Sequence, residues 1–204
     1  MWALVESNNV TQVYTRPRAL TIGDVNYPSN IFMLWSSSEL EAIGIYAVVI
    51  DNSNLKDKDY YINTNQSFAF ADGTVTATYG TATAIAIADT LYTAQDETDG
   101  LGTEGEVKSK GLKTNHKAII NQQAGGILQP TDWMVVRAAE GGTAVPSSIT
   151  TKRAAVRTKA NAMQVQIDNA ANVDALATLY AYVNTGTEDS PVYERPLGEL
   201  PLVD

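Results

Sequence analysis

The chain has 204 residues, with 23 acidic and 14 basic side chains, one histidine and no cysteine. These counts exclude a disulfide framework, a thiolate zinc site, an iron–sulfur cluster and a cysteine nucleophile. A single histidine, His116, also excludes a two-histidine zinc motif. The formal net charge of −9 argues against nucleic acid as a partner, because phosphates would be repelled. Composition therefore favours structure or binding over catalysis, with no cofactor expected.

Residues 1–95 are predicted to form a β-rich module, because β-branched and aromatic residues alternate there with turn formers. Ser7-Asn8-Asn9 predicts a hairpin, since Asn tolerates positive φ. A short serine-capped helix with acids in its first turn is expected near Ser38–Ile43. The regular spacing of the strands favours a small antiparallel sheet or barrel, with strands expected at residues 2–6, 10–14, 45–50, 60–64, 66–70 and 75–79.

The second half of the chain has a different pattern. Residues 96–106 are rich in glycine and acids and predict a linker. In residues 107–183 the apolar spacing becomes helical. Residues 184–204 read as an extended acidic tail. The predicted fold class is α+β, with a helical hairpin or bundle after the β module, and helices are expected at residues 107–127, at 131–140 with Thr131 as N-cap, at 147–169, and after the Asn172 cap.

Charge is distributed unevenly along these segments. Residues 1–106 carry a net charge of −10, residues 107–183 carry +5, and residues 184–204 carry −4. Four cations of the third helix fall largely off its apolar face and form a basic outer face that suits an acidic partner surface: Lys152, Arg153, Arg157 and Lys159. The alternative, which base rates favour, is a helix face that is simply solvated.

None of the residues with reactive side chains forms a recognisable catalytic motif. His116 lies on the apolar side of its helix, which favours a structural role over a general base. Asp51, Asp57 and Asp59 are rich in oxygen but lack the spacing of a calcium loop, so a solvated turn is favoured. Many acids could supply a glycosidase pair, and nothing in the sequence selects one.

Two tryptophans are candidates for sugar stacking. Trp35 ends an apolar run and Trp133 begins an amphipathic helix, so each is predicted to be a core anchor before it is a sugar platform. Trp133, next to the basic helix, is also a candidate for protein interaction, and Trp35 is a weaker candidate for stacking on a glycan.

Two stretches of the chain resemble segments of known proteins. The resemblance leaves residues 47–106 and the tail unmatched. The first stretch, Met1-Trp2-Ala3-Leu4-Val5, Tyr27-Pro28-Ser29-Asn30-Ile31-Phe32, Trp35-Ser36, Glu39-Leu40 and Ile43-Gly44-Ile45-Tyr46, is similar to the N-terminal module of proteins encoded beside tail-fibre genes. The second stretch is Lys113–Lys117, Ile127–Arg137, Glu140, Thr143–Pro146 and Thr151–Arg157. It is similar to the helical C-terminal part of bacteriophage tail-fibre-associated and tail-fibre-assembly-like proteins.

The resemblance implies a virion structural protein at the fibre or baseplate of a phage tail. Its expected partners are other tail proteins, and it is expected in the virion after synthesis in the host cytoplasm. The alternatives are an assembly chaperone that binds the fibre tip through the basic helices, and a glycan-binding tail protein that attaches to a host surface glycan. A homo-oligomer, most simply a trimer, is expected because the helical apolar stripe is too narrow for a core of its own. No membrane insertion is expected.

Overall fold

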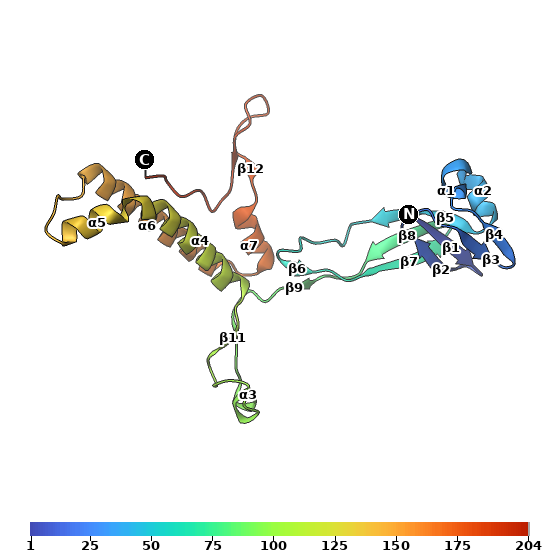
Figure 1. Ribbon diagram of the computed structural model, residues 1–204, viewed down its shortest axis with the longest axis horizontal. Helices are drawn as coiled ribbons and strands as arrows, with labels where there is room; N and C mark the ends of the chain where they lie inside the picture. Colours follow the sequence, from blue (N-terminus) through green and yellow to red (C-terminus); the bar gives the residue numbers. More distant parts are fainter. Residues whose placement is uncertain (204) are drawn as a thin grey trace. The chain divides into compact units, whose positions relative to one another are not determined.

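The structure is a computed structural model that describes residues 1–203 and divides into two compact units, Met1–Thr83 and a second unit that begins at Ala84. The first unit is mainly β and the second mainly helical, which confirms the predicted α+β class (Figure 1). The division falls earlier than the boundary expected near residue 95. Within residues 1–203, no helix is both long and apolar enough to span a bilayer.

A five-stranded sheet forms the first unit, in the order β2-β1-β5-β8-β7. Ser7 and Asn8 have φ values of 49° and 61°, so the two-residue hairpin turn predicted from the asparagines is confirmed. Asp72 and Gly73, both at positive φ, make the equivalent turn between β7 and β8. The strands of the sheet are β1 (Trp2–Glu6), β2 (Asn9–Tyr14), β5 (Ile45–Asp51), β7 (Gln66–Ala71) and β8 (Thr74–Tyr79).

The sheet is mixed, whereas the sequence predicted an antiparallel one. β5 pairs with β8 in parallel, and the other neighbours are antiparallel. The reason is the β7–β8 hairpin, whose second strand pairs with β5 after the chain has reversed direction between Asn52 and Asn65. Two short two-stranded sheets are also present. β3 (Leu20–Ile22) pairs with β4 (Val25–Tyr27), and β6 (Tyr61–Ile62) pairs with β9 (Thr83–Ala84).

Two short helices, α1 (Ile31–Leu34) and α2 (Ser37–Ala42), cover part of one sheet face. The serine cap predicted for α2 is present: Ser36 and Glu39 form a reciprocal capping box. The core between these helices and the sheet contains seven buried side chains: Leu4, Tyr14, Leu20, Ile31, Phe32, Leu40 and Ile45. This core gives the first unit its own hydrophobic centre.

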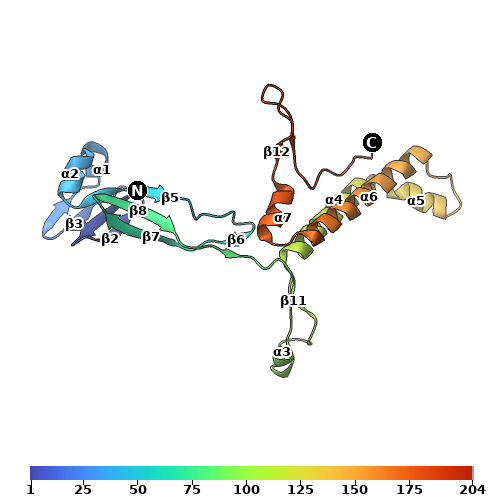
Figure 2. The ribbon, with the colours of Figure 1, turned by 180° about the vertical axis from the view of Figure 1, so that it is seen from behind.

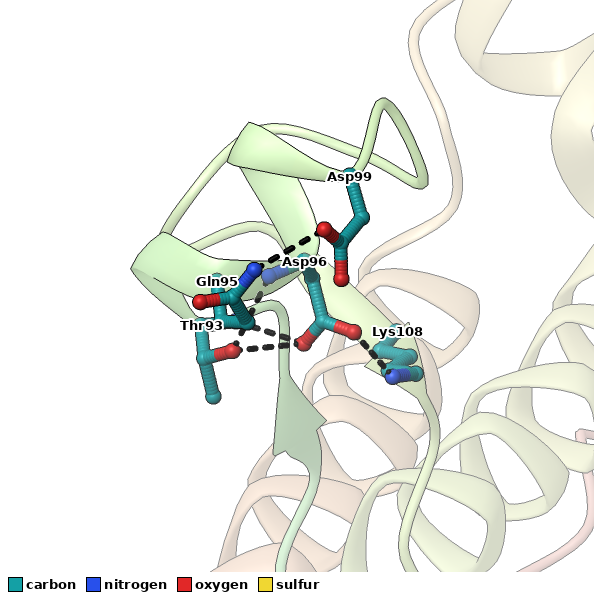
Figure 3. A network of polar contacts seen from close by, with 5 residues as sticks. All are labelled: Thr93, Gln95, Asp96, Asp99 and Lys108. Carbon is teal, nitrogen blue, oxygen red and sulfur yellow. Dashed lines mark hydrogen bonds and ion pairs between the residues drawn. The ribbon is translucent and has the colours of Figure 1, made fainter.

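The predicted linker is folded into a hairpin. Strands β10 (Thr90–Leu91) and β11 (Val107–Ser109) pair, and α3 (Ala94–Thr98) lies between them. The Asp96 carboxylate accepts hydrogen bonds from the Thr93 amide at 2.9 Å and hydroxyl at 2.8 Å, and from Lys108 Nζ at 2.6 Å (Figure 3). These contacts lower the pKa of Asp96 to about 2, with the Lys108 contact as the largest cause.

Two long antiparallel helices, α4 (Leu112–Leu128) and α6 (Ser147–Asn169), form the centre of the second unit (Figures 1 and 2). Lys117 Nζ pairs with Asp168 Oδ1 at 2.7 Å, and Gln164 donates to Asn121 at 2.9 Å, which fixes their register. The predicted apolar stripe of α6 is confirmed, because Val156, Ala160, Met163 and Ile167 are all buried. Along the chain, the 3-10 turn η1 (Gln129–Thr131) and helix α5 (Asp132–Ala139) connect α4 to α6.

Helix α7 (Val173–Tyr180) follows, and the predicted Asn172 cap is confirmed by a 2.8 Å bond from the Ala175 amide. Strands β12 (Val183–Asn184) and β13 (Tyr193–Glu194) then form a small hairpin. The predicted extended tail is anchored in part, because Leu197 is fully buried and its amide donates to the Leu179 carbonyl at 3.0 Å. The tail therefore contributes to the helical core.

Candidate protein-interaction surface

Arg153 is buried, so its predicted place on an exposed basic face is wrong. Its guanidinium donates to the Leu128 carbonyl at 2.7 Å, to Thr131 Oγ1 at 2.5 Å and to Asp132 Oδ1 at 2.7 Å. These partners lie at the end of α4, in η1 and at the start of α5. Thr131 is also no side-chain N-cap, because its hydroxyl donates back to the Leu128 carbonyl. Arg153 therefore holds the turn between α4 and α5.

Lys159 also makes a contact within the chain. Its ammonium group donates to the Leu197 carbonyl at 3.0 Å and so fastens the tail onto α6. Lys152 is half-buried and Arg157 is exposed. The four cations therefore form no continuous basic face, because the helix stripe used by Arg153 is the one that packs against α4 and α5.

Helix α5 exposes three large apolar side chains, which we call the α5 patch: Trp133, Val135 and Val136. Their exposed fractions are 55%, 42% and 55%. Trp133 is therefore no core anchor, contrary to the sequence-based preference. The Arg137 guanidinium lies 4.8 Å from the centre of the Trp133 ring, an arrangement that orients the indole while leaving it open to solvent. Trp133 and Val136 lie one turn apart on the same side of α5, whereas Val135 faces another side of the helix. These exposed apolar side chains make α5 a candidate protein-interaction site.

A surface pocket of about 270 Å³ adjoins this patch. Val135 and Val145 provide its apolar wall, Thr150 a hydroxyl, and Arg153 and Arg157 the cationic side. Arg153 is committed to internal partners, so Arg157 is the cation that a ligand would meet. The pocket can take an apolar side chain from a partner and place an acidic group beside Arg157.

The other residues considered in the sequence analysis pack against neighbouring side chains or hold turns. Trp35 is half-buried against the core of the first unit, with its ring 5.8 Å from Tyr27 in an edge-on arrangement. His116 packs against Tyr180, ring centre to ring centre 4.5 Å. Asp51 and Asp57 accept amide hydrogen bonds from the residues two positions on, Ser53 and Asp59, at 2.8 and 2.9 Å, which confirms solvated turns. Within residues 1–203, no group of three potential metal-binding side chains is present.

The sequence did not single out Val135, Val136, Val145 or Thr150. One signal for the first two was available. The run Trp133-Met134-Val135-Val136 places apolar side chains all round the helix, more than one buried face can hold.

Comparisons with protein-family models, curated protein sequences and solved structures found no match to this chain.

Proposed function

We propose that this chain is a non-enzymatic structural subunit of a bacteriophage tail, in the fibre or baseplate region, where it links tail proteins. The observation that carries the proposal is the large surface that the folded chain leaves exposed. The resemblance of its N-terminal and helical segments to tail-fibre-associated proteins supplies the setting. The charge division of the sequence, with acidic segments on either side of a basic one, suits contacts with other proteins.

The described chain exposes 12,950 Å². A compact monomer of 21.9 kDa is expected to expose about 9,300 Å². Even two separate compact bodies that shared this mass would expose only about 11,200 Å² in total. A standard protein interface covers about 800 Å² on each partner. The excess is therefore large enough for at least one interface, as expected of a subunit that is completed by its neighbours.

The α5 patch and the pocket beside Arg157 are the contact proposed for a neighbouring tail protein. The two alternative functions have less support. A chaperone that binds through the basic helices would need an exposed basic face, and Arg153 and Lys159 are turned to internal partners. A glycan site at Trp35 would need an open ring face, and this ring is packed against the core.

Mass spectrometry of purified particles tests the proposal, using a phage that encodes this chain. The chain should be present in mature particles at a constant ratio to the fibre and baseplate proteins. Val136→Asp should remove it from the particle, because a carboxylate cannot be buried without a partner. Ala171→Asp, an exposed position in the loop before α7, is the matched control and should leave incorporation unchanged. A chain that is abundant in infected cells and missing from mature particles would contradict the proposal.

A further inference from the structure

We infer that the hairpin formed by β10, α3 and β11 docks on the α5 patch of a second copy of this chain. We call this hairpin the acidic arm and define it as residues 90–109. The inference rests on the proposed function for the α5 patch as a contact, and it deepens that proposal by naming the partner. The acidic arm and the α5 patch both belong to the second unit.

The acidic arm exposes apolar side chains that it does not bury by itself. Leu91 and Val107 are partners in the β10–β11 ladder, and both are exposed. Leu101, in the loop after α3, is 59% exposed. None of the residues of α3 is buried. A two-stranded hairpin without a core is marginally stable in water, so burial of these side chains against another surface would stabilise it.

The charge around these side chains is negative. Residues 93–106 carry five acidic side chains and no basic one. Asp96 is paired with Lys108. Within residues 1–203 no ion pair engages the other four acids, which are Glu97, Asp99, Glu104 and Glu106. The acidic arm therefore presents an apolar centre with carboxylates around it, and its best partner is an apolar surface with cations.

The α5 patch lies in a surface of this kind. Residues 132–159 carry five basic and two acidic side chains, and one of the acids, Asp132, is paired with Arg153. Arg137 lies over the exposed ring of the patch, and Arg157 lines the adjoining pocket. The charges of the arm and of the patch are therefore complementary, which favours their association.

The pocket beside the α5 patch also fits the loop of the arm. Its volume is about 270 Å³, enough for a leucine side chain, and Val135 and Val145 give it an apolar wall. The backbone of Leu101 is held in place, because its amide donates to the Asp96 carbonyl at 2.9 Å. Insertion of Leu101 into this pocket brings the acids of the arm beside Arg157.

The arm and the patch of one chain do not meet. The arm leads into the start of α4, where the Gly111 amide donates to Asp89 at 2.8 Å, and α5 follows the end of α4. The 17 residues of α4 span about 25 Å. Leu101 and Trp133 are both exposed in the described chain. Docking therefore joins two copies, and because the two surfaces differ, it repeats head to tail as a ring or a filament.

Because the chain has no cysteine, paired cysteine variants test this contact. Leu101→Cys is mixed under mild oxidation with Thr150→Cys, a position that lines the pocket. The disulfide between these variants should form at least about tenfold faster than the one between Leu101→Cys and Ala155→Cys, because docking raises the effective concentration of the first two thiols. Ala155 is exposed on α6 and lies outside the pocket. Equal rates in the two mixtures would overturn the inference.

Complementation tests the head-to-tail arrangement. Leu101→Asp removes the apolar side chain of the arm, and Arg157→Glu reverses the charge beside the patch, so each variant alone should be a single chain in native mass spectrometry. Their mixture should contain a two-chain species, because the arm of one variant and the patch of the other are intact. Val192→Asp, at an exposed position before β13, is the matched control and should associate like the wild type. A wild-type mass of one chain, or a mixture without the two-chain species, would contradict the contact.

The result with purified protein is independent of the result with phage particles. A chain that stays monomeric in purified form but enters particles through the α5 patch would overturn the contact between copies and leave the proposed function. A chain that associates head to tail but is missing from mature particles would do the reverse.

Discussion

Some single residues stabilise this fold through contacts that the sequence alone does not predict. Arg153 and Arg157 lie four positions apart on α6, yet one is buried with three partners and the other is exposed. Helical periodicity predicts the apolar stripe of α6, and it places Arg153 within that stripe, four residues after Ile149 and three before Val156. It cannot show that the Leu128 carbonyl and Thr131 hydroxyl lie within reach, because those groups belong to a turn folded back in three dimensions.

Replacing Arg153 by methionine should lower the free energy of unfolding by about 1–3 kcal/mol. The Leu128 carbonyl and Thr131 hydroxyl would lose a donor, and most of the cost comes from them because the Asp132 side chain is 55% exposed. Arg157→Met should change the free energy by less than about 0.5 kcal/mol. Urea denaturation of both variants gives the comparison, and equal losses would contradict the role assigned to Arg153.

Gly44 follows α2 with a φ of 83°, and a Cβ there would lie 2.9 Å from the Val5 carbonyl oxygen. Gly44→Ala should therefore lower the free energy of unfolding by about 1–2 kcal/mol because of the backbone conformation. The close contact with the Val5 carbonyl should lower it further. Gly23→Ala shares the positive φ but would meet no atom within 4 Å. Thermal denaturation should show the larger loss for Gly44→Ala, and equal losses would indicate that the Val5 contact costs nothing.

At the scale of elements, local signals predicted most of the helices and strands. The asparagines of the first turn, the serine cap of α2 and the Asn172 cap of α7 each act within a few residues, so the sequence exposes them. The hairpin at residues 90–109 was missed, because its ladder and the Lys108–Asp96 contact join residues that are 12 or more positions apart in the sequence. Composition alone reads such a segment as a linker. The α5 patch was missed in part, since exposure depends on what α5 packs against.

The β10–β11 hairpin should become less stable in acid. The pKa of Asp96 is lowered from 3.8 to about 2, so its ionised form stabilises the hairpin at pH values above about 3.8. That stabilisation is lost as the pH falls from there through about 2. The Thr93 amide, which donates to Asp96, should titrate in NMR spectra with a midpoint near 2. Asp96→Asn should abolish the transition and Asp99→Asn should leave it, whereas a wild-type midpoint near 3.8 would contradict the network.

At the scale of the whole molecule, the chain has two small cores and much uncovered surface. The first core lies between the sheet and α1 and α2, and the second lies among α4, α6, α7 and Leu197. Within the second unit, the α5 patch stays exposed. The narrow helical stripe of α6 led to the expectation of a homo-oligomer, which stays a prediction, because the structure buries that stripe against α4 within one chain. Which surfaces stay open could not be predicted, because burial depends on the packing of the whole unit.

The proposed function requires the α5 patch to be covered by another protein in the phage tail. Hydroxyl-radical footprinting with mass spectrometry tests it most directly, by comparing Trp133 oxidation in the free protein and in purified particles. Trp133 is 55% exposed in the free chain, so it should oxidise readily there and at least about fivefold more slowly in the particle. Equal oxidation of Trp133 in the free chain and in the particle would contradict the claim.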